Sequence, residues 1–99
     1  QAIELNPREP EYYSFLAWTL YLSEGAAQHV RANAALRVLK KALSLNPYLE
    51  RAQVIHAIIE SEQGEDTSAR RRLLKVLEMN PKSAIAKAAL LRVGRPGRA

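Results

Sequence analysis

The stretch Leu45-Asn46-Pro47 returns as Met79-Asn80-Pro81, and a similar stretch, Leu5-Asn6-Pro7, lies near the beginning of the chain. Pro47 and Pro81 are 34 residues apart, whereas Pro7 and Pro47 are 40 residues apart, which is one such period plus six inserted residues. Because proline is not tolerated in the interior of a helix, each stretch is expected to end one. A fixed period of this length predicts a helix–turn–helix unit that is used repeatedly.

The composition limits the kind of protein. The chain has 99 residues, of which 47% are hydrophobic and 25% charged, as expected for one small globular domain. The most apolar run, residues 15–22, is far too short to span a bilayer, so no membrane contact is expected. The absence of cysteine excludes disulfides and cysteine-based zinc sites. The net charge of +5 suits a basic solvated surface and is compatible with an acidic partner.

Turn residues and apolar spacing predict five helices. Apolar residues recur at three- and four-residue spacing, which is the pattern of an amphipathic helix. Pro10 suits a helix start, Gly25 and Gly64 suit turns, and Asp66 or Thr67 is expected to cap the fourth helix. The expected helices cover residues 9–24, 31–45, 48–62, 66–79 and 82–93.

The repeat resembles the tetratricopeptide repeat (TPR) family over nearly the whole chain. In that family, small residues lie where the two helices of a unit cross, and a proline ends the unit. The matching small residues are Ala17 and Ala35 in the first unit and Ala57 and Ala69 in the second, and the matching prolines are Pro47 and Pro81. The resemblance implies an all-α fold, a right-handed superhelix of antiparallel helix pairs.

The resemblance also implies a domain organisation. Residues 1–93 would form the TPR domain, in which residues 1–7 end a preceding repeat helix and residues 82–93 form a capping helix. Repeat 1 would cover residues 8–47, with the six-residue insertion, and repeat 2 residues 48–81. Residues 94–99 are expected to form a basic flexible tail. Since about three repeats are normally needed for stability, preceding repeats or self-association are expected to complete the fold.

A group of aromatic residues is the first candidate site. In the TPR family, the first helix of each unit lines a concave face on which peptides or partner helices dock. On this chain that face would include Ser14, Phe15, Trp18, Tyr21, Val54 and Ile58. Exposed tryptophan and tyrosine side chains are typical of binding hot spots, so a protein or peptide partner is expected. Two alternatives remain: preceding repeats cover these aromatics, or they form a homodimer interface.

One specialised TPR function can be rejected from the residues. Some TPR adaptors hold the C-terminal carboxylate of heat-shock chaperones in a clamp of lysine, asparagine and arginine. The matching positions here are Ser14, Trp18, Ile55, Ile85 and Ala89, and none of them can serve in such a clamp. We therefore expect that this chain does not bind chaperone tails in that way.

A basic run is the second candidate site. Arg70, Arg71 and Arg72 are consecutive, and Lys75 shares a helical face with Arg71 by i,i+4 spacing. A basic patch of Arg71, Arg72 and Lys75 could contact phosphates, although a solvated helix face is the simpler interpretation. No aromatic side chain is interleaved with the arginines, which makes nucleic-acid binding the least favoured function.

Residues with catalytic chemistry are scarce. The chain has no HExxH, GxSxG or Walker motif and no paired catalytic carboxylates, so it is expected not to be an enzyme and to need no cofactor or metal. His29 and His56 are its two histidines, and His56, one turn before Glu60, is interpreted as a packing residue. The alanine- and arginine-rich composition suits a bacterial protein, and a cytoplasmic location is expected. The predicted function is that of a non-enzymatic scaffold or adaptor that binds an apolar peptide or helix, with a structural repeat segment or a homodimerisation module as the alternative.

Overall fold

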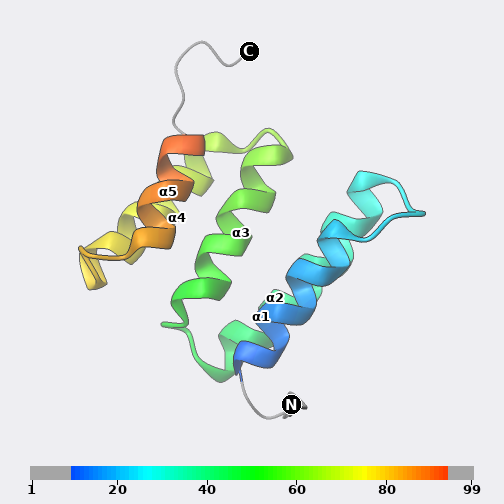
Figure 1. Ribbon diagram of the computed structural model, residues 1–99, viewed down its shortest axis with the longest axis horizontal. Coiled ribbons are helices and arrows are strands. Elements are labelled where there is room, and N and C mark those ends of the chain that lie inside the picture. The colour runs from blue at the N-terminus through cyan, green and yellow to red at the C-terminus, as the bar shows by residue number, and fades with distance from the viewer. Residues whose placement is uncertain (1–9, 94–99) are drawn as a thin grey trace. The chain divides into compact units, whose positions relative to one another are not determined.

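The protein is all-helical, as predicted. The computed structural model describes residues 10–93, which contain five α helices and no strand. In chain order (Figure 1) they are α1 (Pro10–Leu22), α2 (Gln28–Leu45), α3 (Glu50–Glu62), α4 (Asp66–Met79) and α5 (Ala84–Val93). The expected end of a preceding helix in residues 1–7 and the expected tail in residues 94–99 lie outside the described residues. No helix among residues 10–93 is long and apolar enough to cross a membrane.

The Asn-Pro stretches end helices in the same way twice. The backbone N–H of Asn46 donates to Ala42, and that of Asn80 donates to Val76, which closes α2 and α4. The Asn46 side-chain oxygen then accepts the N–H of Tyr48 at 3.0 Å, as the Asn80 oxygen accepts that of Lys82 at 3.3 Å. An asparagine side chain that binds the backbone two residues later forms an Asx turn. The repeated motif is therefore a repeated turn, as its spacing predicted.

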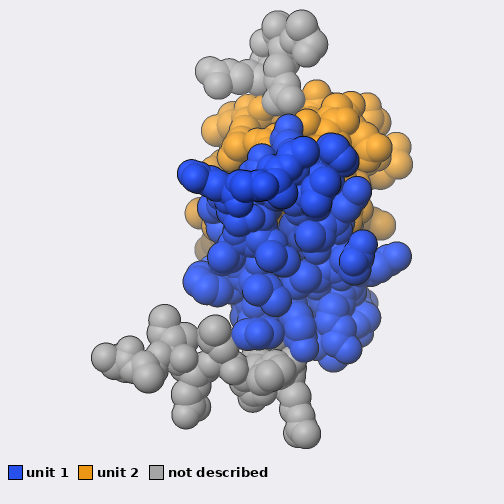
Figure 2. Space-filling view, turned by 90° about the vertical axis from the view of Figure 1, so that its right-hand side faces the viewer, with its two compact units in different colours: residues 1–52 blue, residues 53–99 orange. Residues whose placement is uncertain are grey.

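The chain divides into two compact units, residues 1–52 and 53–99, which Figure 2 colours separately. In the first unit, α1 and α2 pack together. Side chains of no exposed area form its core: Ala17, Ala32, Ala35, Leu39 and Ala42. Alanine dominates this core because small side chains allow two helix backbones to approach closely, which is the role predicted for Ala17 and Ala35.

The link between α1 and α2 is shorter than predicted. Helix α2 begins at Gln28, three residues before the expected start at 31. Gly25 has a φ of +97°, a conformation that favours glycine, and it turns the chain as expected. Arg31 then holds the turn, because its Nη1 donates to the Tyr21 carbonyl at 2.8 Å and its Nε to the Ala26 carbonyl at 3.1 Å. Compared with the second unit, the six inserted residues thus lengthen the loop between the two helices and also extend the helix after it, α2.

The second unit has one hydrophobic cluster built from three helices. Its buried members are Val54 and Ala57 of α3, Ala69, Leu73 and Val76 of α4, and Ala86, Ala89 and Val93 of α5. Gly64, with a φ of +91°, makes the predicted turn between α3 and α4. The predicted cap of α4 by Asp66 or Thr67 is wrong. Glu65 is the N-cap residue and makes no side-chain cap bond, whereas the Asp66 carboxylate accepts the Ser61 hydroxyl at 2.6 Å.

Candidate functional site

Helix α1 exposes a row of apolar side chains in the first unit. Phe15 is 60% exposed and Leu22 is 57% exposed, and the partly exposed Trp18 lies between them in the helix. Residues at i, i+3 and i+7 share one face of a helix, so these three form a continuous stripe. We call Phe15, Trp18 and Leu22 the α1 stripe. Large apolar side chains that remain in contact with water are typical of interaction surfaces.

Two residues predicted for the same face are buried instead. Ser14 has no exposed area and Tyr21 is 5% exposed. They lie three residues before and four residues after the fully buried Ala17, so all three share the core face of α1. The Tyr21 hydroxyl also accepts a hydrogen bond from Gln28 Nε2 at 3.1 Å. The prediction that Tyr21 is an exposed anchor is therefore wrong, and Ser14 is inaccessible as well.

Burial leaves the Ser14 hydroxyl in an unusual state. Its oxygen is buried and has no hydrogen-bond partner among residues 10–93. Such a group loses its contact with water without a replacement, which costs about 1 to 3 kcal/mol. Ser14 is therefore an element of the core with an energetic cost, and no contact of the structure explains why a serine occupies this position.

The Trp18 ring is held by its neighbours on α1. Its centroid lies 6.0 Å from that of Tyr21, with the two rings tilted by 35°. Because Tyr21 is fixed by Gln28 and by packing in the core, this contact restricts the rotamers that Trp18 can adopt. A side chain that is already ordered loses less entropy when a partner binds it. Trp18 is thus the preorganised member of the α1 stripe.

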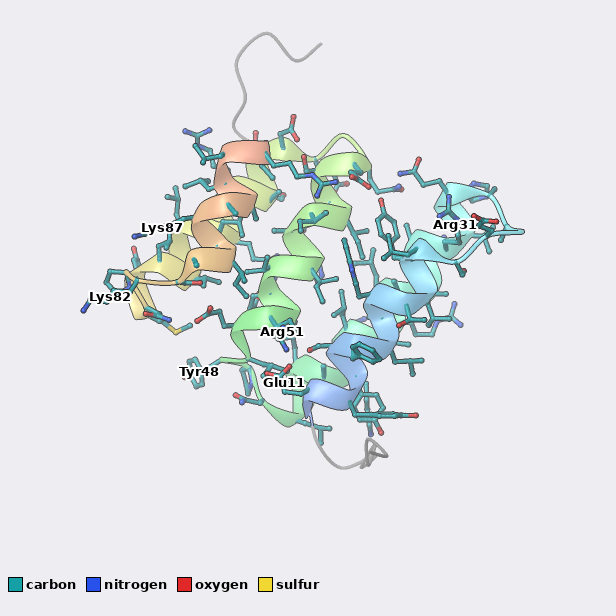
Figure 3. The ribbon with its side chains drawn as sticks, in the orientation of Figure 1. Glu11, Arg31, Tyr48, Arg51, Lys82 and Lys87 are labelled. Atoms are coloured by element: carbon teal, nitrogen blue, oxygen red, sulfur yellow. The ribbon has the colours of Figure 1, made fainter. Side chains whose placement is uncertain are left out.

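An ion pair lies near the beginning of α1. Arg51 Nη1 donates to Glu11 Oε1 at 3.3 Å, and Figure 3 shows the two labelled side chains directed toward one another. The side chains are 59% and 51% exposed, so water screens the pair and its contribution to stability is small. The pair gives this end of the first unit polar character.

The other two predicted face residues, Val54 and Ile58, belong to the second unit. Val54 is 5% exposed and is a member of the hydrophobic cluster, and Ile58 is partly buried against that cluster. The prediction that Val54 offers an accessible apolar surface is wrong, because its side chain packs in the core with residues of α4 and α5. The α1 stripe therefore carries the accessible apolar area of the candidate face.

The predicted basic patch contains one residue that is already paired. Arg71 and Lys75 are exposed, but Arg72 is half-buried and binds residues of α3. Its Nε donates to Glu60 Oε1 at 3.0 Å and its Nη2 to Glu60 Oε2 at 3.3 Å. Its Nη1 donates to Gln53 Oε1 at 2.8 Å. The prediction that Arg72 belongs to the basic patch is therefore wrong, because its guanidinium group already binds Glu60 and Gln53 within the unit.

His56 lies against this polar group. Its Nδ1 is 3.6 Å from Glu60 Oε1, which is beyond hydrogen-bonding distance, and this nitrogen is buried without a hydrogen-bond partner. Burial is the main cause that lowers the pKa of His56, and the positive charge of Arg72 lowers it further. The carboxylate of Glu60 opposes these effects only in part. His56 is therefore a neutral packing residue at neutral pH, as the sequence indicated.

The lowered pKa of His56 predicts that stability depends on pH. Because the folded chain binds a proton at His56 less tightly than the unfolded chain, unfolding takes up a proton below about pH 6.5. The free energy of unfolding should be constant with respect to this group above that pH, and should fall as the pH decreases toward the folded pKa. Urea unfolding from pH 7.5 to 5 should show this decrease in the parent chain and a smaller decrease in His56→Leu. The exposed His29 is the control position, so an equal flattening by His29→Gln would contradict the assignment.

The described residues contain no candidate metal site. Among residues 10–93, no group of three or more His, Asp or Glu side chains could hold a metal ion. A scan against family models found no match, and searches of curated proteins and of solved structures found no match either. The resemblance to the TPR family therefore stays a prediction from the repeated motif and the small residues.

Proposed function

We propose that this chain is a non-enzymatic protein-interaction module of TPR-like repeats, which binds apolar side chains of a peptide or helix on α1. The observation that carries the proposal is the α1 stripe, in which Phe15 and Leu22 are more than half exposed and flank Trp18. Burying such side chains against a partner removes apolar area from water, which is the main driving force of association. The mode would be the docking of an apolar segment on a preformed helix surface.

The alternative is that the same stripe joins two copies of the chain or packs against further repeats. Homodimerisation and packing against further repeats would bury the same side chains as a bound partner would, so the exposure of the stripe is compatible with all three. Sedimentation equilibrium over a wide concentration range separates the first alternative from the proposal. A monomer at all concentrations agrees with binding of another partner. A dimer that Phe15→Ser converts to a monomer would replace the proposal by a homodimerisation function.

The binding function can be tested with peptides selected from a random phage-displayed library against the full chain. We expect the selected peptides to share apolar residues at spacings that fit the stripe. Phe15→Ala combined with Leu22→Ala should weaken their binding by at least about tenfold, which corresponds to about 1.4 kcal/mol. Fluorescence anisotropy with labelled peptides measures the change.

The control for this test lies in the same unit. Val30, near the beginning of α2, is 50% exposed and is not part of the stripe. Val30→Ala removes a similar exposed side chain and should leave peptide binding unchanged. Selected peptides that bind the stripe variant as tightly as the parent chain would show that α1 is not the binding surface.

A further inference from the structure

The second helix of each unit carries the same exposed row of side chains. The row consists of an arginine, a lysine and an apolar residue, each four residues after the one before it, and all are exposed: Arg37, Lys41 and Leu45 on α2, and Arg71, Lys75 and Met79 on α4. Residues four apart share one face of a helix. The two rows are related by the 34-residue period of the Asn-Pro stretches. We call them the α2 basic stripe and the α4 basic stripe.

Each basic stripe lies on the side of its helix that the unit leaves free. On α2, the fully buried Leu39 lies midway between Arg37 and Lys41. On α4, the fully buried Leu73 lies in the same way between Arg71 and Lys75. Because residues two apart point to nearly opposite sides of a helix, the cations face away from the packed side. Both helices are followed by a further described helix, so neither lies at an end of the described chain.

No contact within the units explains the four cations. Within residues 10–93, the ion pairs involve other basic residues: Arg51, His56, Arg72 and Arg92. Cations stabilise the last turn of a helix, but neither α2 nor α4 has a basic residue there. Like charges four residues apart repel each other and weaken a helix. Binding of an anionic partner would offset this repulsion, and all four side chains are available for it.

The apolar member of each stripe indicates what kind of anion fits. Leu45 is 45% exposed and Met79 is 51% exposed, each one turn after a lysine. A phosphate backbone offers an apolar side chain no matching contact, and no aromatic residue for base stacking lies within either stripe. One apolar side chain per stripe is also little to anchor a helix in a lipid surface. An acidic protein segment with an apolar residue complements all three positions.

We propose that each basic stripe binds an acidic amphipathic helix of a partner protein. Two carboxylates of that helix, one turn apart, pair with the arginine and the lysine, and an apolar side chain one turn further covers Leu45 or Met79. Four residues span about 6 Å along any α helix, so the charges of two helices match at this spacing. The basic stripes share no residue with the α1 stripe, and neither proposal depends on the other.

The probe is an alanine-based peptide of about 20 residues, because shorter isolated helices are marginal in water. It carries two glutamates four residues apart and a leucine four residues outside each, so that it can bind in either direction. Exposed ion pairs are individually weak, so binding is followed by the backbone amide NMR shifts of the full chain. We expect saturable shifts confined to the two stripes and their neighbours, and weaker binding as salt is added. The matched control peptide has glutamine in place of both glutamates.

Charge reversal in the chain tests the pairing itself. Lys75→Glu should weaken binding at α4 by at least about fivefold and leave the shifts at α2 unchanged, because each unit carries its own stripe. Lys87, an exposed cation of α5 that projects from its helix (Figure 3), provides the control. Lys87→Glu makes the same change in net charge and should leave both sites unchanged. Circular dichroism of the two variants checks that they fold as the parent chain does.

Four outcomes would overturn the proposal. These are an absence of shifts at the stripes, equal shifts with the glutamine peptide, binding that Lys75→Glu leaves unchanged, and equal weakening by Lys75→Glu and Lys87→Glu. A short DNA duplex and vesicles of phosphatidylglycerol and phosphatidylcholine are titrated in parallel. Tighter binding of either one at the stripes would replace the acidic helix by a nucleic acid or a membrane surface.

Discussion

Replacing Leu73 by alanine is expected to lower the free energy of unfolding by about 3 kcal/mol, since this substitution removes buried methyl groups and leaves a cavity. Leu73 has no exposed area and lies in the cluster that joins α3, α4 and α5. Its neighbours come from three helices, so they cannot all move inward to fill the space. The change is measured by urea unfolding, with an unchanged denaturant slope as evidence that the unfolded state is the same.

The adjacent residue offers a matched control for this prediction. Leu74 is 46% exposed on the same helix, and Leu74→Ala removes the same atoms from a surface position. Its effect should remain within about 0.5 kcal/mol. Equal losses from Leu73→Ala and Leu74→Ala would mean that the hydrophobic cluster of the second unit is not the source of its stability.

The repeated turns could be predicted from the sequence because their causes are local. Proline is not tolerated in the helix interior. The side-chain oxygen of the asparagine before it accepts a hydrogen bond from the backbone N–H two residues later, as the oxygens of Asn46 and Asn80 both do. The turn at Gly64 also has a local cause, since its φ of +91° favours a residue without a Cβ atom. The expected cap at Asp66 failed because the carboxylate accepts a hydrogen bond from a different donor, a side-chain hydroxyl. The hydroxyl of Ser61, five residues earlier, donates to this carboxylate in place of a backbone N–H of α4.

The burial of Ser14 and Tyr21 on α1 could have been predicted from helical spacing. Ala17, which was predicted to lie at the helix crossing, is fully buried, and Ser14 and Tyr21, at i−3 and i+4 from it, share its buried face. The resemblance to the TPR family implies exposed positions for Ser14 and Tyr21, whereas this spacing implies buried ones. Phe15 and Leu22, on the opposite side, retain their exposure. For Val54, the sequence shows an apolar position but not the elements that cover it, because α4 and α5 are distant in the chain.

Arg72 shows what spacing predicts and what it leaves undetermined. It lies three residues after Ala69 and four before Val76, both buried, so it belongs to the edge of the buried face and not to the exposed run. That much could be read from the sequence. Its partners could not, because Gln53 and Glu60 lie on another helix and the distances depend on how α3 and α4 pack.

Arg72→Ala is therefore expected to destabilise the fold strongly, whereas Arg71→Ala is not. Removing Arg72 leaves the Glu60 carboxylate, which is 12% exposed, without the cation that binds both of its oxygens. A poorly solvated charge without its partner should cost about 2 kcal/mol, less than for a fully buried pair because water still reaches Arg72. Arg71 is exposed, and its loss should change the free energy of unfolding by no more than about 0.5 kcal/mol.

The pH dependence of the free energy of unfolding offers a second test of the interaction between Arg72 and Glu60. Without Arg72, a positive charge that lowers the pKa of His56 is removed, while Glu60 remains nearby to raise it. The folded chain should then bind a proton at His56 more readily, so the loss of stability below about pH 6.5 should become smaller in Arg72→Ala than in the parent chain. A variant that lost stability at pH 7.5 but kept the full pH dependence would show that Arg72 stabilises the unit by packing and that its charge does not reach His56.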